Sequence, residues 1–244
     1  MDGFRVMPMS EAAKVARLFV TATDTGVGKT ILSACLLAAM VGEGERVHAH
    51  KPVVSGLDEL PGTWPADHEL LASITGMRAE EVAPLRYGPA VSPHLAAELQ
   101  GERIDPAGML TRARAAGAVD VTLILEGVGG LLVPLATNYT VRDLAVEIGL
   151  PLLIAARPGL GTINHTLLTL QTARAAGLDV CAVVLTPWPE RPSALERSNR
   201  ETIGRLGEIE VEALGLVQSA NRADLTRAGA RLPWRRWLEG SSSS

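Results

Sequence analysis

Buried apolar runs alternate with helix-like segments along this chain. Apolar runs with the length of strands that are buried on both faces occupy residues 17–22, 47–54, 119–126, 150–156 and 178–186. Segments with helical periodicity occupy residues 29–41, 67–75, 93–100, 106–116, 141–148, 163–176 and 193–206. Such alternation is typical of a parallel sheet whose crossovers are helices. The pattern predicts an α/β fold with a doubly wound, mostly parallel sheet and helices on both faces.

The composition is that of a folded protein. Of the 244 residues, 47% are hydrophobic and 20% are charged, which excludes a disordered or fibrous chain. We expect a polar leader at 1–16 that can be disordered, one α/β domain over 17–238 and a flexible tail at 239–244. The net charge of -4, without a basic stripe, argues against nucleic acid as a partner. No secretion signal or membrane span is evident, so we expect a cytoplasmic protein.

In an open parallel sheet, ligands bind outside the carboxyl ends of the strands. The loops predicted to lie there are residues 23–28, 55–67, 127–130, 158–162 and 187–192. These loops are therefore where functional side chains are expected.

The first of these loops has the composition of a phosphate-binding loop. It reads Thr23-Asp24-Thr25-Gly26-Val27-Gly28-Lys29-Thr30 and leads directly into a helix. The glycines let backbone N–H groups approach phosphate oxygens, Lys29 offers a charge to the β and γ phosphates, and the Thr30 hydroxyl suits Mg²⁺. Thr23 stands where the common pattern begins with Gly, so this is a deviant P-loop. Nucleotide binding is predicted, and a plain strand-to-helix turn is the alternative.

Two further side chains are expected beside this loop. Mg²⁺ usually takes one or two carboxylates in addition to phosphate and water, and Glu126 ends an apolar strand. A solvated glutamate is the alternative interpretation. Lys51 lies in the last half of the second predicted strand, where it either extends its charge to solvent or faces an anion. Together with Lys29 it would suit a substrate that gains negative charge during the reaction.

The chain resembles the dethiobiotin synthetases. The resemblance covers about residues 17–190 and rests on the segments 19–30, 51–56, 92–94, 126–130 and 161–165, in family order and at similar spacing. It implies an ATP- and Mg²⁺-dependent cyclo-ligase of biotin biosynthesis that forms C–N bonds. Such an enzyme closes CO₂ and 7,8-diaminononanoate into dethiobiotin through a carbamate and a carbamic-phosphoric anhydride. A homodimer is implied as well.

The resemblance also implies roles for individual residues. Lys51 and Lys29 would hold the carbamate and the migrating phosphoryl oxygens, with help from Thr25. The residues implied in ATP binding are Gly26, Val27, Gly28, Lys29, Thr30, Ile31, Asp67, Glu126, Gly127, Val128 and Gly129. The implied Mg²⁺ ligands are Thr30, Asp67 and Glu126, although a helix-capping role for Asp67 is an equal alternative. The implied substrate contacts are Ser55 at the diamine end and Gly161, Thr162 and Asn164 at the carboxylate tail, partly across the dimer interface.

One position departs from the family pattern. Thr186 and Pro187 stand where the family commonly has an Asn-Asp pair that binds adenine. Threonine lacks the paired donor and acceptor of a carboxamide, and proline has no N–H. We therefore hypothesise a relaxed preference for the nucleotide base.

Two other classes of protein share this style of loop. Partitioning ATPases, which use the nucleotide as a switch, place a second lysine five residues before the loop lysine, and Asp24 stands there in this chain. Cobyrinate-type amide synthases carry an added glutaminase domain with a nucleophilic cysteine. Here Cys35 and Cys181 both lie in apolar runs, where buried free thiols are expected.

Overall fold

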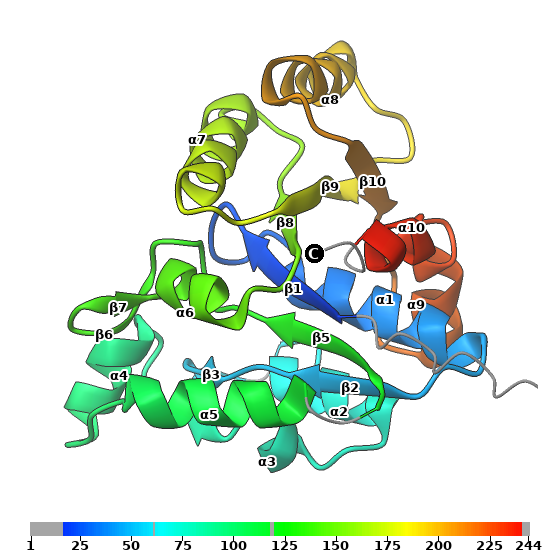
Figure 1. The fold of residues 1–244 in the computed structure, drawn as a ribbon. Coiled ribbons are helices and arrows are strands. Elements are labelled where there is room, and N and C mark those ends of the chain that lie inside the picture. The colour runs from blue at the N-terminus through cyan, green and yellow to red at the C-terminus, as the bar shows by residue number, and fades with distance from the viewer. Residues whose placement is uncertain (1–16, 61, 118–119, 241–244) are drawn as a thin grey trace, which may run out of the picture.

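A six-stranded parallel sheet forms the centre of the protein (Figure 1). The computed structural model describes residues 17–60, 62–117 and 120–240. The strand order is β10-β9-β8-β1-β5-β2. These strands are β1 (Arg17–Ala22), β2 (Val47–His50), β5 (Thr122–Glu126), β8 (Leu152–Ala156), β9 (Val180–Trp188) and β10 (Val211–Gly215). The predicted leader at 1–16 and residues 241–244 of the predicted tail lie outside the described residues.

Helices cover both faces of the sheet, and each face has its own apolar cluster. The helices that contribute to the first cluster are α1 (Lys29–Gly42), α2 (Asp67–Thr75), α3 (Ala79–Val82), α9 (Arg222–Gly229) and α10 (Trp234–Gly240). Those that contribute to the second are α4 (Pro93–Leu99), α5 (Pro106–Gly117), α6 (Val141–Ile148), α7 (Thr162–Ala175) and α8 (Ala194–Gly207). The predicted α/β fold is confirmed, and burial on both faces explains the continuous apolar strands.

The central strand β1 places the phosphate loop. Phe19 pairs with Leu125 of β5 on one side and with Leu152 of β8 on the other. All three strands run parallel, so their carboxyl ends lie at one edge of the sheet. The loops that follow β1, β5 and β8 therefore open side by side.

The predicted strand over residues 47–54 is wrong, because the chain breaks at Lys51. It contains β2 and a separate strand β3 (Val53–Val54), which pairs with β4 (Leu85–Arg86) in a second small sheet. Pro52 has no N–H and cannot continue the ladder. The N–H of Lys51 instead donates to the carbonyl of Val82 at 2.8 Å. Because of this break, Lys51 lies between two strands and is part of neither.

Several elements are absent from the sequence-based prediction. The edge strand β10 has mostly half-buried residues, so its sequence lacks the apolar run of the central strands. Near the C-terminus, α10 buries Trp234 and Trp237 against the first cluster. The other missed elements are α3, α9, β4 and the hairpin of β6 (Pro134–Ala136) and β7 (Tyr139–Thr140).

The structure also shows the state of the two cysteines and the length of the helices. Cys35 is a buried free thiol, as expected, whereas Cys181 is free but only partly buried. In the described part of the chain, no helix is both long enough and apolar enough to cross a membrane.

Candidate functional site

The phosphate loop joins β1 to α1, as predicted. Gly26 and Gly28 have φ angles of 67° and 95°, in the left-handed region that glycine adopts without strain. Gly28 is the N-cap of α1, and its carbonyl accepts the first helical hydrogen bond from Leu32 at 2.9 Å. The free N–H groups and the positive dipole end of α1 therefore open beside Lys29 and Thr30, which suits an anion.

Lys51 connects two carboxylates beneath this loop. Its Nζ lies 2.7 Å from Asp67 Oδ2 and 2.6 Å from Glu126 Oε1. The Thr30 hydroxyl donates to the same Glu126 oxygen at 2.7 Å. Lys51 is 2% exposed and Glu126 is fully buried, whereas the Asp67 side chain is 44% exposed. Four separate chain segments thus meet in one charged cluster.

The surroundings of the two lysines act differently on their charges. Burial alone would lower the pKa of Lys51, but attraction to Asp67 and Glu126 outweighs it and raises the pKa above its usual value. Lys51 therefore stays cationic. Burial, together with repulsion by Lys51, lowers the pKa of Lys29 to about 8, although Glu126 and Asp67 act in the opposite direction.

Asp67 is ionised within this cluster. Burial would raise the pKa of Asp67, but the nearby Lys51 ammonium, as charge and as hydrogen-bond donor, lowers it to about 2. Asp67 also occupies the first turn of α2, where the helix dipole favours a negative charge. The sequence left capping and metal binding as equal alternatives for Asp67, and the structure brings it into the cluster.

The oxygen atoms of this cluster fit Mg²⁺. Glu126 Oε2 is buried and has no hydrogen-bond partner, an arrangement that costs free energy unless a cation or donor approaches. Thr30 and Asp67 add the hydroxyl and carboxylate oxygens that this ion prefers. Across the described ranges, no group of three or more His, Cys, Asp or Glu side chains could hold a metal. An ion here would thus need phosphate and water to complete its shell, as Mg²⁺ usually does.

A cavity of about 690 Å³ opens over the cluster. The predicted site residues that line it are Thr25, Gly26, Gly28, Lys29, Thr30, Ile31, Lys51, Ser55, Asp67, Val128 and Gly129. Val27, Glu126 and Gly127 are buried and do not line it. The volume is within the range of small-molecule sites. One cavity therefore joins the phosphate loop to the predicted diamine end at Ser55.

The predicted contacts for the substrate tail are not on this cavity. Gly161 caps α7 with a φ angle of 89°, and Thr162 is buried with its hydroxyl 3.3 Å from that of Thr166. Asn164 is exposed. Their role in binding a carboxylate across a dimer interface stays a prediction.

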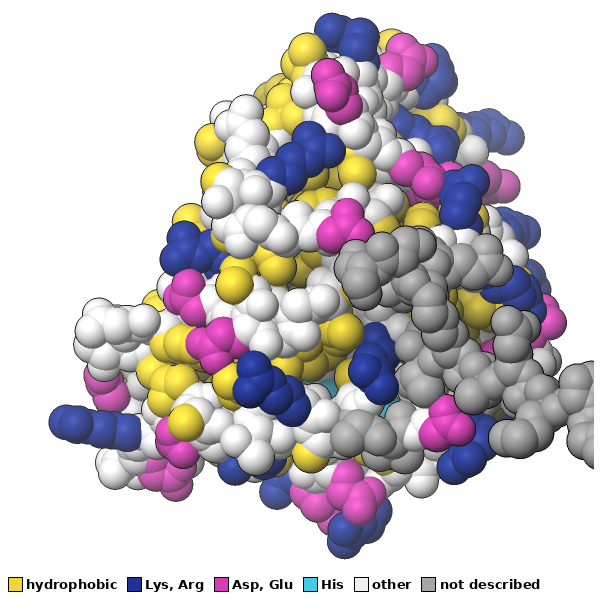
Figure 2. Space-filling model, viewed as in Figure 1, with side chains coloured by type: hydrophobic (Ala, Val, Ile, Leu, Met, Phe, Trp, Pro, Cys, Tyr) yellow, Lys and Arg dark blue, Asp and Glu magenta, His cyan; other side chains and the backbone are white. Residues whose placement is uncertain are grey.

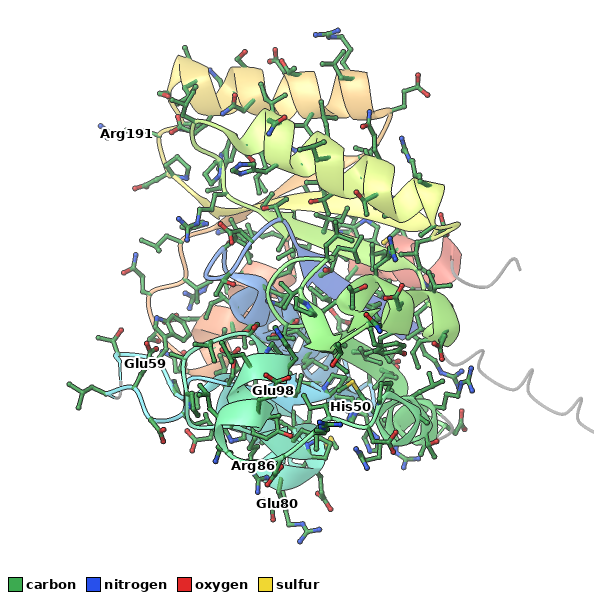
Figure 3. The ribbon with its side chains drawn as sticks, turned by 90° about the vertical axis from the view of Figure 1, so that its left-hand side faces the viewer. His50, Glu59, Glu80, Arg86, Glu98 and Arg191 are labelled. Atoms are coloured by element: carbon green, nitrogen blue, oxygen red, sulfur yellow. The ribbon has the colours of Figure 1, made fainter. Side chains whose placement is uncertain are left out.

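Other cavity-lining residues were missed by the sequence analysis. They are Val54, Gly56, Glu59, Trp64, Pro65, Leu70, Ala90, Val91, Ser92, Pro93 and Val133. Several lie in the loop 55–67, of which the sequence analysis singled out only Ser55 and Asp67. Figure 3 shows Glu59 and Arg191 at the same edge of the molecule, where loops from the carboxyl ends of the strands gather. Loop composition indicated this edge, but not which side chains face inward.

Lys29 should make ATP binding depend on pH. With a pKa of about 8 in the free protein, Lys29 loses its proton as the pH rises through 8. Bound phosphate favours the charged ammonium, so binding should take up a proton and weaken between about pH 8 and about pH 9. Isothermal titration calorimetry in buffers of different ionisation enthalpy measures both effects. Lys29→Arg, which stays charged, should remove them; a parent dissociation constant that is flat over this range would contradict the assignment.

Known proteins resemble this chain over most of its length. A family model described as an AAA domain matches residues 16–226. The ATP-dependent dethiobiotin synthetase BioD of Mycobacterium sp. (strain KMS) is 36% identical over 225 residues, which cover 91% of this chain and 98% of that protein. The corresponding protein of Anaeromyxobacter dehalogenans (strain 2CP-1 / ATCC BAA-258) is 43% identical over 199 residues, 81% of this chain and 88% of that protein.

A solved structure supports the fold separately. Chloroplast FtsY from Physcomitrella patens superposes with a TM-score of 0.50 at 15% identity, over 93% of this chain and 69% of that one. This likeness concerns the fold alone. The two synthetase relatives match 91% and 81% of this chain. The phosphate loop and Lys51 line one cavity, and the buried Glu126 lies directly behind it, 2.6 Å from Lys51. The chain therefore belongs to the dethiobiotin synthetase family.

Proposed function

We propose that this enzyme uses ATP and Mg²⁺ to join CO₂ to 7,8-diaminononanoate and to close the cyclic urea of dethiobiotin. One observation carries the assignment of the site: two buried lysines and two carboxylates converge where the phosphate loop meets the cavity. The relatives are named ATP-dependent dethiobiotin synthetases, and the residues present suit that chemistry. The cytoplasmic location stays a prediction.

The reaction accumulates negative charge at every step. One amine of the substrate adds to CO₂ and loses a proton, which gives a carbamate. The carbamate oxygen then takes the γ-phosphoryl group of ATP and releases ADP. Finally, the second amine attacks the carbonyl carbon of the carbamic-phosphoric anhydride, loses a proton, expels phosphate and closes the ring. Enzymes accelerate such phosphoryl transfers mainly by positioning the reactants and by stabilising the developing negative charge.

The two lysines would supply that stabilisation. Lys29, at the start of α1, would hold the β and γ phosphates together with the N–H groups of the loop. Lys51 keeps its charge because the carboxylates raise its pKa, so it can face a developing oxyanion without losing its proton. Thr25 lines the same cavity and would assist from the loop.

Thr30, Asp67 and Glu126 would hold Mg²⁺. When bound, the ion would neutralise negative charge on the phosphate oxygens during phosphoryl transfer. The unpartnered oxygen of Glu126 supports this ligand set. Ser55 would contact the diamine end; its hydroxyl donates to the carbonyl of Val91 at 2.7 Å, so the side chain is already oriented beside the cavity.

We also propose that the enzyme is a homodimer. A groove of about 640 Å³ lies between α6 and α7, and exposed Leu132 and Val146 line it. Figure 2 shows hydrophobic side chains gathered between these two helices. Apolar side chains that are left exposed together suit contact with a second copy.

The function is tested by turnover. The purified enzyme is incubated with 7,8-diaminononanoate, bicarbonate, Mg²⁺ and ATP, and the ureido product is detected by mass spectrometry. Product and ADP should appear in equal amounts, and neither should form when the diamine is omitted. ATP hydrolysis without a ureido product would contradict the proposal.

The base preference should be broad. Thr186 is buried, and its methyl group packs on the phosphate loop: a Cβ built on Gly28 would lie 3.1 Å from Thr186 Cγ2. The side chain therefore offers no carboxamide pair to an adenine ring. Initial rates with ATP, CTP and GTP, each at the same subsaturating concentration, should agree within about tenfold. Strict dependence on ATP would contradict this expectation.

A further inference from the structure

Arg157 joins the end of β8 to the phosphate loop. Its Nη2 donates to the carbonyls of Thr25 and Gly26, at 3.4 Å and 3.2 Å. These contacts connect segments that lie more than 130 residues apart in the chain. Arg157 does not line the cavity, and within the described residues no carboxylate lies within ion-pair distance of it. Its acceptors are thus backbone groups of the loop itself.

The two contacts constrain the peptide planes of the loop. In a trans peptide the N–H points away from the carbonyl of the same unit. Carbonyls of Thr25 and Gly26 that face Arg157 therefore turn the N–H groups of Gly26 and Val27 to the opposite side. A phosphate-binding loop works by presenting consecutive N–H groups to the anion, and a carbonyl in their place would repel it. Gly26 is especially free to rotate, because it is a glycine with a φ of 67°.

The segment that carries Arg157 is itself held from α8. Asn199 is 5% exposed, and its Nδ2 donates to the carbonyls of Pro158 and Gly159, at 2.8 Å and 3.1 Å. Both amide protons of this buried side chain are used on two successive carbonyls. Together with the fixed φ of Pro158, this limits the movement of the backbone next to Arg157.

We propose that Arg157 is a positioning residue that orients the peptide groups of the phosphate loop, and that Asn199 holds the segment from which it reaches. The proposal rests on the phosphate-binding role of that loop given under the proposed function. The loop would bind the phosphates about equally in the substrate complex and in the transition state. Its misalignment should therefore weaken nucleotide binding more than it slows the chemical step.

The test compares Arg157→Ala and Arg157→Lys with a matched control, Arg78→Ala. Arg78 is an exposed arginine paired with Glu81, away from the cavity. We expect the dissociation constant and the KM for ATP to rise about tenfold in Arg157→Ala, with kcat within about twofold of the parent. Arg157→Lys should retain part of the affinity, and Arg78→Ala all of it.

A purely structural role would give a different result. It would lower the melting temperature and the active fraction, and hence the apparent kcat, while the affinity of the folded protein for ATP stayed unchanged. That result would overturn the proposal and leave the proposed function intact. Failure of the parent itself to bind ATP would overturn both.

A double-mutant cycle tests whether Asn199 acts by holding the segment that carries Arg157. Asn199→Ala should raise the dissociation constant for ATP by less than Arg157→Ala does. The double variant should be little weaker than Arg157→Ala alone, because Asn199 acts through the segment that carries Arg157. Fully additive effects, or an unchanged dissociation constant in Asn199→Ala, would overturn this link.

Discussion

Replacement of Lys51 by methionine should lower kcat by about 10²- to 10³-fold, the usual cost of removing one group that stabilises developing oxyanion charge. The variant keeps the volume of the side chain and loses the ammonium that lies 2.7 Å from Asp67 and 2.6 Å from Glu126. No other cation contacts these carboxylates in the described part of the chain. Steady-state formation of the ureido product, with both substrates saturating, measures the effect.

Stability must be followed in the same variant. Loss of one partner of a buried ion pair typically costs about 3–5 kcal/mol, because the other charge is left without compensation. Lys51→Met is therefore compared with the double variant Lys51→Met/Glu126→Gln, in which the buried carboxylate is neutral as well. The double variant should unfold at a higher temperature than Lys51→Met and stay inactive. A folded Lys51→Met enzyme with the kcat of the parent would remove Lys51 from the mechanism.

Glu126→Gln should strongly weaken productive Mg²⁺ binding. The substitution keeps the shape of the side chain and an oxygen that can accept from Thr30, but it removes the negative charge and one carboxylate oxygen. We expect the Mg²⁺ concentration for half-maximal rate to rise by at least about 100-fold, because a buried charged ligand is lost. Turnover measured against MgCl₂ at fixed ATP determines it.

The matched control for this variant is Glu81→Gln. Glu81 is exposed and pairs with Arg78 at the surface, so its loss should shift neither the Mg²⁺ dependence nor the rate. If Glu126→Gln gave the same Mg²⁺ titration as the parent, Glu126 would be a partner of Lys51 only. The ligand set would then have to be sought elsewhere on the cavity.

The phosphate loop shows how far sequence analysis extends. Its glycines, Lys29 and Thr30 are consecutive, and an apolar strand and a helix flank them, so local pattern alone indicated both position and role. Glu126 at the end of a buried strand could be predicted in the same way. Lys51 was found as well, but on a strand predicted to be continuous. The break at Pro52 depends on pairing with Val82 and β4, which lie 30 residues or more along the chain.

Asp67 and Arg157 mark the limit of that approach. An aspartate at a helix start is an ordinary cap in most sequences, and only its 2.7 Å contact with Lys51 distinguishes it here. Arg157 follows an apolar strand like many surface arginines, and nothing near it in the chain indicates that it reaches the phosphate loop. Trp64 and Glu59 likewise could be assigned to a loop, but not to a cavity wall.

Local patterns in the chain were enough to predict the α/β class, the phosphate loop and most of the chemically active side chains, because strand burial, helix periodicity and a Gly-rich turn are properties of neighbouring residues. Which of these groups contact one another depends on the three-dimensional fold. Lys51 and Glu126 are 75 positions apart, and the order of the strands, with β5 between β1 and β2, brings their side chains together. The strand order depends on how the helices pack on both faces of the sheet. This packing involves the whole chain, so it cannot be predicted from neighbouring residues alone.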